Sequence, residues 1–177
     1  MATKFSMRCP ALMRRLAWLA LPLLFALASC GQSQGVSRTG VGLTGIDHLA
    51  DHLSVQEFSV NGTSGAQAGK GGRVVCCVSL PDQWQPGMTV KVRWNVTNWR
   101  DCKGEEHEAV VPVEKYEEVG DLQVHFFPNN KVRVVSSIYA PWSGPMPGSK
   151  YPIKDPIPQK EPWKIYPPHE HCKESFE

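Results

Sequence analysis

Two short runs of this chain combine histidine with acidic or cysteine side chains, and each could bind a metal ion. His48 and His52 stand four residues apart within residues 47–52, the spacing that places two side chains on one face of a helix. In the zinc-protease pattern a glutamate follows the first histidine, and Leu49 stands there instead. The second run, at residues 169–172, lies near the chain end, where polar tails are common. We expect a solvated turn at residues 47–52 and predict no metal site.

Paired carboxylates could serve in acid–base catalysis, which requires an apolar pocket to raise the pKa of one of them. The pairs Glu105-Glu106 and Glu117-Glu118 lie in polar segments that we expect to face water. The sequence contains neither a GxSxG nucleophile motif nor a phosphate-binding Walker motif. We therefore predict a protein that is not an enzyme and that uses no cofactor.

The cysteines predict an oxidising compartment. Beyond residue 30 there are four: Cys76, Cys77, Cys102 and Cys172. An even number in an exported domain favours two disulfides. Neighbouring side chains on a strand point to opposite faces, so we expect Cys76 and Cys77 to reach different partners, with Cys102 and Cys172 shared between them in either order. A zinc site is the alternative, although the chain lacks the CxxC spacing typical of one.

The first 29 residues have the regions of an export signal. Four basic residues precede an apolar stretch at 16–27, which is shorter than the roughly 20 residues that span a bilayer. Residues 27–30 (Leu-Ala-Ser-Cys) then resemble the lipobox of bacterial lipoproteins, in which the signal is cut before the cysteine and the cysteine is acylated. We expect lipid on Cys30 to anchor the protein; the alternative is an ordinary signal with a chance cysteine.

Compartment and charge narrow the possible partners. In Gram-negative lipoproteins an aspartate after the acylated cysteine favours the inner membrane, so Gly31 favours the outer membrane and a periplasmic domain. Four of the 19 Lys and Arg residues lie in the signal, which leaves 15 basic residues against 17 acidic ones. A nearly neutral, slightly acidic domain argues against a nucleic-acid partner.

We divide the chain into four parts by composition. Residues 1–29 are the signal, and 30–45, rich in Gly, Ser and Thr, are a flexible tether. Residues 46–140 form the folded domain. Residues 141–177 contain nine prolines, which exclude a regular helix or a central strand, and we expect this segment to pack over the domain as extended chain.

Alternation of apolar and polar residues predicts an all-β domain. Met88 to Val96 alternates as a half-buried strand, while residues 98–108 read as a polar loop. Pro112 places the next strand at an edge. The other expected features are a strand at 55–60 with a turn at Asn61-Gly62, a strand at 73–80 buried on both faces, a strand at 109–116, and a hairpin of 122–127 with 132–138. We predict a small β-sandwich or curled antiparallel sheet of about six strands.

The central segment resembles a known family in several short motifs. These are residues 58–62 (FSVNG), 75–81 (VCCVSLP), 84–87 (WQPG), 90–94 (VKVRW) and 122–126 (LQVHF). They are similar to motifs of a Gram-negative lipoprotein family long catalogued as a domain of unknown function. Some members are encoded beside lipase effectors of type VI secretion systems and are proposed to be periplasmic immunity proteins. The similarity covers residues 46–140.

The resemblance implies a lipid-anchored immunity protein that binds a phospholipase effector and inhibits it. Two alternatives stay open: a structural lipoprotein of the envelope without a toxin partner, and a module that binds a metal or small ligand. The resemblance supplies no catalytic motif, so the partner-binding residues must be chosen from the sequence itself.

For the contact surface, our first choice is the polar segment 98–108. It carries Trp99, Arg100, Asp101, Glu105, Glu106, His107 and Glu108. A disulfide at Cys102 would make this segment rigid, and a preorganised loop with an aromatic anchor favours tight binding. The alternative is a solvated loop without a partner. Our second choice is the proline-rich segment around Trp142 and Tyr151.

Overall fold

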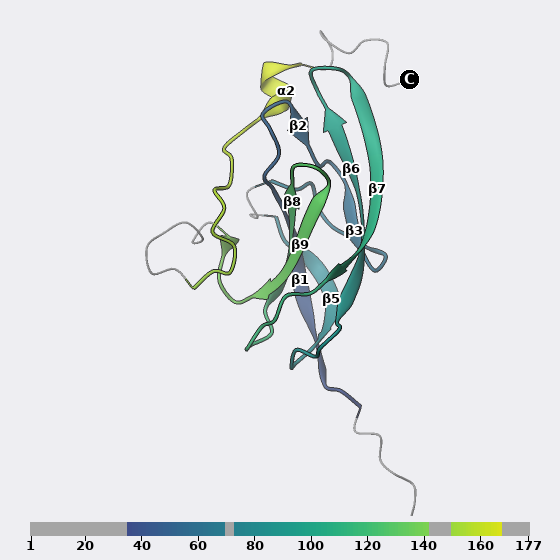
Figure 1. The fold of residues 1–177 in the computed structure, drawn as a ribbon, viewed down its shortest axis with the longest axis vertical. Coiled ribbons are helices and arrows are strands. Elements are labelled where there is room, and N and C mark those ends of the chain that lie inside the picture. The colour runs from purple at the N-terminus through teal and green to yellow at the C-terminus, as the bar shows by residue number, and fades with distance from the viewer. Residues whose placement is uncertain (1–34, 70–72, 142–149, 168–177) are drawn as a thin grey trace, which may run out of the picture. The chain divides into compact units, whose positions relative to one another are not determined.

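The computed structural model describes residues 35–69, 73–141 and 150–167, which form nine strands and one short helix (Figure 1). Cys30, Trp142, Cys172 and the run at 169–172 lie outside the described residues. The elements are β1 (Arg38–Asp47), β2 (Leu53–Ser54), β3 (Phe58–Val60), β4 (Thr63–Ser64), β5 (Val75–Pro81), β6 (Thr89–Asn98), β7 (Lys103–Pro112), β8 (Asp121–Phe127), β9 (Lys131–Ser137) and α2 (Pro162–Ile165).

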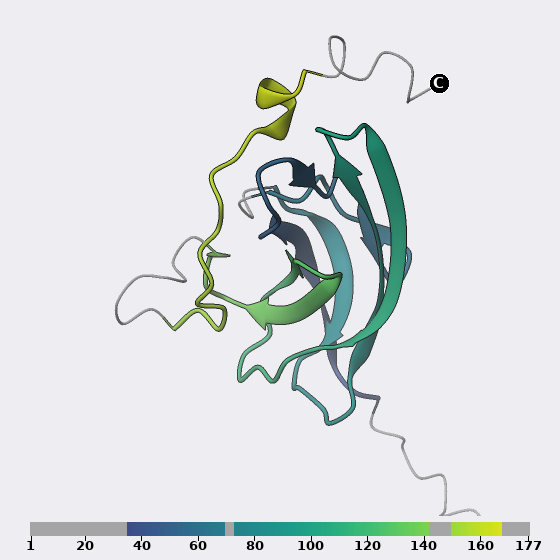
Figure 2. The same cartoon turned by 45° about the horizontal axis from the view of Figure 1, so that its top comes forward.

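The strands form two sheets that curl toward each other as a half-barrel (Figures 1 and 2). The first sheet has the order β5-β1-β8-β9, and in it β1 and β8 run parallel. In the second sheet β7 pairs with β6 on one side, and β2 and β3 pair with β6 on the other. A bridge between Val113 and Val134 joins the two sheets at one end. The all-β prediction is confirmed, with one parallel pair in an otherwise antiparallel arrangement.

The core lies between the concave faces of the two sheets. Val90, Val92 and Trp94 of β6 are buried, as their alternation predicted, and Phe126 of β8 packs against Trp94 with ring centroids 5.9 Å apart. The turn at Asn61-Gly62 is also confirmed. Both residues have positive φ, 50° and 88°, which is the backbone of the two-residue hairpin that joins β3 to β4.

β1 lies where a flexible tether was predicted. This strand pairs with both β5 and β8, and Leu43 is fully buried. The strand was not predicted because the glycines of β1 weaken the apolar–polar alternation that marks a strand. Gly45 has a packing reason: a Cβ there would lie 2.7 Å from the ring of Phe58 and 2.9 Å from the Cβ of Ala68. The folded domain therefore begins before residue 46.

Most of the segment 98–108, which was predicted to be a polar loop, belongs to β7. This strand begins at Lys103 and pairs with β6 over ten residues, so only Trp99–Cys102 connect the two strands. The error has a physical reason. Because β7 is an edge strand whose first half is exposed, polar residues occupy both of its faces, and no alternation marks the strand.

The predicted cysteine pairing is wrong for Cys76 and Cys77, which form a disulfide with each other. The pairing of β1 with β5 skips Cys77: Val41 pairs with Val78, and Gly42 pairs with Cys76. Such a bulge interrupts the alternation of side chains on which the prediction relied. Cys102 is also disulfide-bonded. The start of β5 is exposed, so the prediction that this strand is buried on both faces is wrong as well.

Residues 150–160 of the proline-rich segment pack over the domain as extended chain, as predicted, whereas Pro162–Ile165 form the short helix α2, which the prediction had excluded. We call residues 150–160 the C-terminal strap. In Figures 1 and 2 this strap runs alongside the first sheet and leads up to α2. Tyr151 and Ile153 are both 1% exposed and form a small second core with Val135 of β9 and Phe127 of β8.

Candidate protein-binding site

The β6–β7 hairpin carries most of the residues that the sequence singled out for partner binding. Its register places Glu108 opposite Arg93, and Glu106 opposite Asn95, on the convex face of the sheet. On the concave face His107 lies opposite Trp94 and Glu105 opposite Val96. The four residues predicted to act together, Glu105, Glu106, His107 and Glu108, are thus divided between two surfaces.

On the convex face Glu108 forms ion pairs with two basic side chains. Its carboxylate oxygens lie 2.7 Å from Lys91 Nζ and 2.9 Å from Arg93 Nε. The hydrogen bond from Lys91 holds the pKa of Glu108 below its usual value. Glu106 is exposed and has no ion pair within the described part of the chain. The hairpin therefore presents two cations that share one carboxylate, beside the unpaired carboxylate of Glu106.

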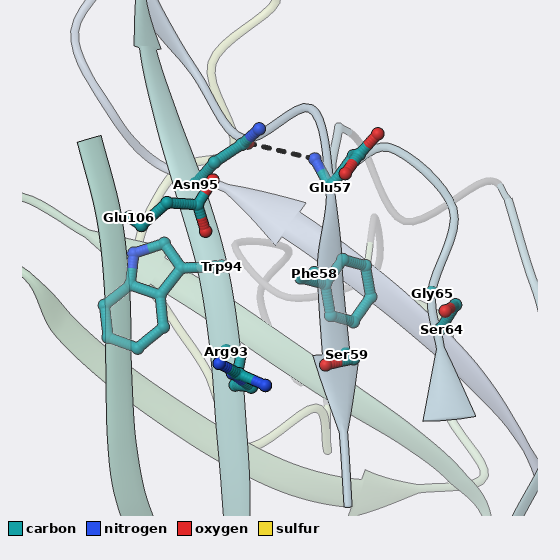
Figure 3. Close-up of a pocket in the computed structure, with 9 residues that line it drawn as sticks. All are labelled: Glu57, Phe58, Ser59, Ser64, Gly65, Arg93, Trp94, Asn95 and Glu106. Atoms are coloured by element: carbon teal, nitrogen blue, oxygen red, sulfur yellow. Dashed lines mark hydrogen bonds between the residues drawn. The ribbon is translucent and has the colours of Figure 1, made fainter. Parts of the chain in front are cut away.

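A pocket of about 430 Å³ opens beside Glu106, between β3, β4, β6 and β7 (Figure 3). Figure 3 shows Glu57 across from Asn95, whose side-chain oxygen accepts the backbone N–H of Glu57 at 3.0 Å. The same oxygen accepts the N–H of Gln56, also at 3.0 Å. These bonds fix the approach of the chain to β3. Two carboxylates, Glu57 and Glu106, consequently border one hollow with Arg93.

The turn between β6 and β7 is held by side chains at its own base. Asn98 Oδ1 accepts the N–H of Asp101 at 3.0 Å, and Asn98 Nδ2 donates to the Asp101 carboxylate at 2.9 Å. Arg100 donates to the same carboxylate, and this bond lowers the pKa of Asp101. Cys102 closes the turn with φ of 54° and a disulfide. Hydrogen bonds and a disulfide therefore constrain this turn.

Trp99 fastens the turn to neighbouring elements. Its indole N–H donates to Ser54 Oγ of β2 at 2.7 Å, and its backbone N–H donates to His52 O at 2.9 Å. Its ring meets the Trp163 ring of α2 edge-on, with centroids 6.2 Å apart. Trp163 and Ile165 are 37% and 59% exposed, so α2 adds apolar surface beside the turn. The sequence reading did not select these two residues.

Tyr151 was predicted to contact a partner, and this prediction is wrong because its side chain is buried. Its hydroxyl lies 2.5 Å from His125 Nε2 and also contacts the side-chain oxygen of Gln123. Tyr151 therefore fastens the strap to β8. Trp142, the other aromatic of that prediction, lies outside the described residues.

A buried pair of histidines continues this network. His48 Nδ1 lies 2.9 Å from the carbonyl oxygen of Pro156, so it must donate, and a neutral His48 then accepts at Nε2 from His125 Nδ1, 2.8 Å away. Burial lowers the pKa of both rings, to about 3 for His125, where the neighbouring His48 and Arg133 add to the effect. The solvated turn predicted for Asp47 and His48 is thus wrong, since both are buried.

Lys160 completes the attachment of the strap. Its ammonium group lies 3.1 Å from Asp47 Oδ1 and donates to the carbonyl oxygens of Leu49, Ala50 and Leu53 at 2.7–3.0 Å. Burial lowers the pKa of Lys160 and raises that of Asp47, while their mutual attraction opposes both shifts. No local sequence pattern could predict this pair, because its members are 113 residues apart.

Among the described residues, His, Cys, Asp and Glu side chains form no group of three or more that could hold a metal ion. No described helix is long and apolar enough to cross a membrane.

Comparison with known proteins places this hairpin inside one sequence family model. Residues 50–134 match the model described as "Protein of unknown function (DUF3304)". The match extends from just before β2 into β9 and so includes the whole β6–β7 hairpin, whereas β1 and the strap lie outside it. The search of curated proteins gave no match, and neither did the search of solved structures.

Proposed function

We propose that this protein is a lipid-anchored periplasmic immunity protein that binds a phospholipase effector of a type VI secretion system and blocks it. The observation that carries the proposal is the β6–β7 hairpin, which holds a half-buried tryptophan beside an exposed arginine and several exposed carboxylates in a bonded arrangement. An inhibitor of this kind needs no chemistry of its own. It needs a surface that is already in its binding conformation.

The physics of tight binding favours such a surface. Binding energy concentrates in a few anchors, most often Trp, Tyr and Arg, and ordering loose loops on binding reduces affinity. Trp99 and Arg100 are anchors of this type on a turn that is already ordered. Glu57 and Glu106 supply negative charge that would speed encounter with a basic partner surface.

The position of the hairpin also suits a tethered inhibitor. β1 begins at Arg38 at one end of the domain, and the β6–β7 turn lies at the other end (Figures 1 and 2). A domain tethered from the β1 side would hold the turn away from its point of attachment. A phospholipase that approaches the membrane would therefore meet the turn first.

Co-expression with the lipase of the neighbouring gene, exported to the periplasm, tests the proposal. We expect the wild-type chain to protect cells and to co-purify with the lipase. A variant with Trp99 and residues 105–108 replaced by alanine should lose protection. The matched control replaces Glu117 and Glu118, two exposed acids of another loop, and should protect fully.

Two results would count against the proposal at different levels. A wild-type chain that neither protects nor binds any lipase would refute the immunity function. Full protection by the alanine variant would refute only the assignment of the hairpin. Co-purification with a complex of the envelope would support the structural alternative instead.

A further inference from the structure

One side of β7 is not paired with any described strand. β7 is the outermost strand of its sheet and pairs with β6 alone (Figures 1 and 2). Just after β7 the chain meets the other sheet, where Val113 forms a bridge with Val134 of β9. Before that bridge, from Gly104 to Val110, no described strand pairs with the side of β7 that faces away from β6. We call this stretch the open edge.

Two hydrogen bonds just beyond β7 show which of its backbone groups face outward. The N–H of Val113 donates to Met88 O, on the β6 side, at 2.9 Å, and the N–H of Glu114 donates to Val134 O, on the β9 side, also at 2.9 Å. Successive N–H groups of a strand point in opposite directions, and β7 pairs with β6 residue by residue without a bulge. The groups that point away from β6 therefore belong to Gly104, Glu106, Glu108 and Val110.

These outward N–H groups make no hydrogen bond within the described part of the chain. The space beside them is also open: on the concave side, a hollow of about 320 Å³ separates β7 from the β8–β9 turn at Pro128–Asn130. A row of unpaired N–H and C=O groups along a strand is the surface to which another extended chain adds by main-chain hydrogen bonds. The open edge therefore selects a β-strand as its occupant.

The charges of β7 argue against a second copy of this chain as that strand. Antiparallel pairing of two open edges about their middle would place Glu106 opposite Glu108 of the other copy. A shift of the pairing by one residue would place Glu106 opposite itself. Like charges directly opposite each other destabilise a sheet. The strand that fits must therefore come from a different protein.

Near the β6–β7 turn the open edge carries more carboxylates than cations. Glu105 and Glu106 are exposed on opposite faces of β7, and Glu57 borders the hollow of Figure 3 beside Glu106. Lys103 contributes one positive charge at this end. Two cations of β6 are already paired with Glu108, namely Lys91 and Arg93. A basic residue on the added strand would therefore gain from the charge of Glu105 and Glu106.

We propose that the open edge binds an extended segment of the lipase partner, which adds to the sheet beside β7 as a further strand. The segment is basic where it passes Glu105 and Glu106, and apolar where it passes Val110, which is 69% exposed. This inference rests on the proposed function for the identity of the partner, while the choice of a strand with this charge rests on the edge alone. The Trp99 turn would contact the lipase at the end of the hairpin, and the open edge would contact it along the hairpin's length.

Amide hydrogen exchange, resolved by residue, tests the open edge first without the lipase. In the mature chain, exported without acylation, the N–H groups of Glu106, Glu108 and Val110 should exchange at least tenfold faster than those of His107 and Ala109, which point toward β6. Each rate is corrected for the intrinsic rate of its residue. Equal protection of both sets would show that the edge is already covered, and this result would overturn the inference whatever the lipase does. Added lipase should slow the outward groups at least tenfold.

A proline on the open edge tests the main-chain hydrogen bonds. Val110→Pro removes one outward N–H and should leave the pairing with β6 intact, because Pro112 already occupies the next outward position. We expect lipase binding at least tenfold weaker with an unchanged midpoint of urea unfolding, whereas Val110→Ala keeps the N–H and should weaken binding less than threefold. The matched control is Glu118→Pro, at an exposed loop position, which should bind as the wild type does.

A charge reversal gives a second test that does not depend on how the proline variant folds. Glu106→Lys changes an exposed side chain without an ion pair in the described part of the chain. It should weaken lipase binding at least fivefold at low salt, and the loss should shrink as salt is raised, because salt screens exposed charges.

The outcomes separate this inference from the proposed function. If the lipase binds but leaves the outward N–H groups unprotected, or if Val110→Pro and Glu106→Lys both bind as the wild type does, the open-edge inference fails and the immunity function stands. If the wild type captures no lipase, the function fails and the lipase segment with it. Protection that appears without lipase as the chain is concentrated would identify a second copy as the occupant and would overturn the proposal.

Discussion

Lys160 Nζ lies 3.1 Å from Asp47 Oδ1, and the two side chains are only 7% and 3% exposed. This ion pair joins the proline-rich strap, which was predicted to lie outside the folded domain, to the end of β1, a strand that was mostly predicted to be tether. The strap is thus a structural part of the domain, which can be tested by stability measurements.

Lys160→Met should strongly destabilise the protein, because it leaves Asp47 as a buried charge without its partner. We expect a loss of about 3–5 kcal/mol in the free energy of unfolding, measured in urea. Asp47→Asn combined with Lys160→Met removes both charges and should recover part of the loss. A cost below about 1 kcal/mol for the single variant would contradict a buried pair.

Stability should fall as the pH drops below about 6.5. His48 and His125 have lowered pKa values in the folded state, so the unfolded chain binds protons first. At pH 7.5 both states hold neutral rings and there is no penalty. Between pH 6.5 and about 3, His125 alone should cost up to about 1.4 kcal/mol per pH unit.

Urea unfolding at pH 7.5, 6.5 and 5.5 would measure this slope. His125→Gln should reduce it, and His52→Gln, at a position outside the buried network, should leave it unchanged. Equal stability of the wild type at pH 6.5 and 5.5 would show that the histidines are not buried as described.

Tyr151→Phe should weaken the attachment of the strap without affecting lipase binding. The variant keeps the ring but leaves His125 Nε2 without its bond, at a cost of about 1–3 kcal/mol. Hydrogen exchange at residues 150–160 should become faster. If Tyr151→Phe instead weakens lipase binding and leaves hydrogen exchange at residues 150–160 unchanged, Tyr151 contacts the lipase directly.

Cys30→Ala should release the protein from the membrane fraction, because we expect lipid on this one residue to be the anchor. The measurement is fractionation of cells followed by detection of the chain in the soluble periplasmic extract. Retention of the variant in the membrane, with normal removal of the signal, would contradict the lipoprotein reading.

Local patterns predicted those parts of the fold that local physics determines. The alternation from Met88 to Val96 gave β6, and Asn61-Gly62 gave the β3–β4 turn. β1 was missed because glycines dilute its apolar pattern, although Gly45 is required by the close approach of Phe58. β7 was missed because an exposed edge strand needs no alternation.

The sequence predicted which residues belong to the candidate site but not how they are arranged on the sheet. The sequence selected Trp99 and residues 105–108, yet it could not show that Glu106 and His107 face opposite sides of the sheet. The histidine pair could not be predicted from the sequence either. His48 and His125 are 77 residues apart, and only the parallel pairing of β1 with β8 brings them together.

Inhibition of the purified lipase is the most direct test of the central proposal. The measurement is phospholipid hydrolysis by the proposed lipase partner as the mature chain is added. We predict that activity falls to background near one chain per lipase, and that Trp99→Ala with Glu106→Lys shifts this titration to at least tenfold higher concentration. Full lipase activity in the presence of excess wild-type chain would contradict the account.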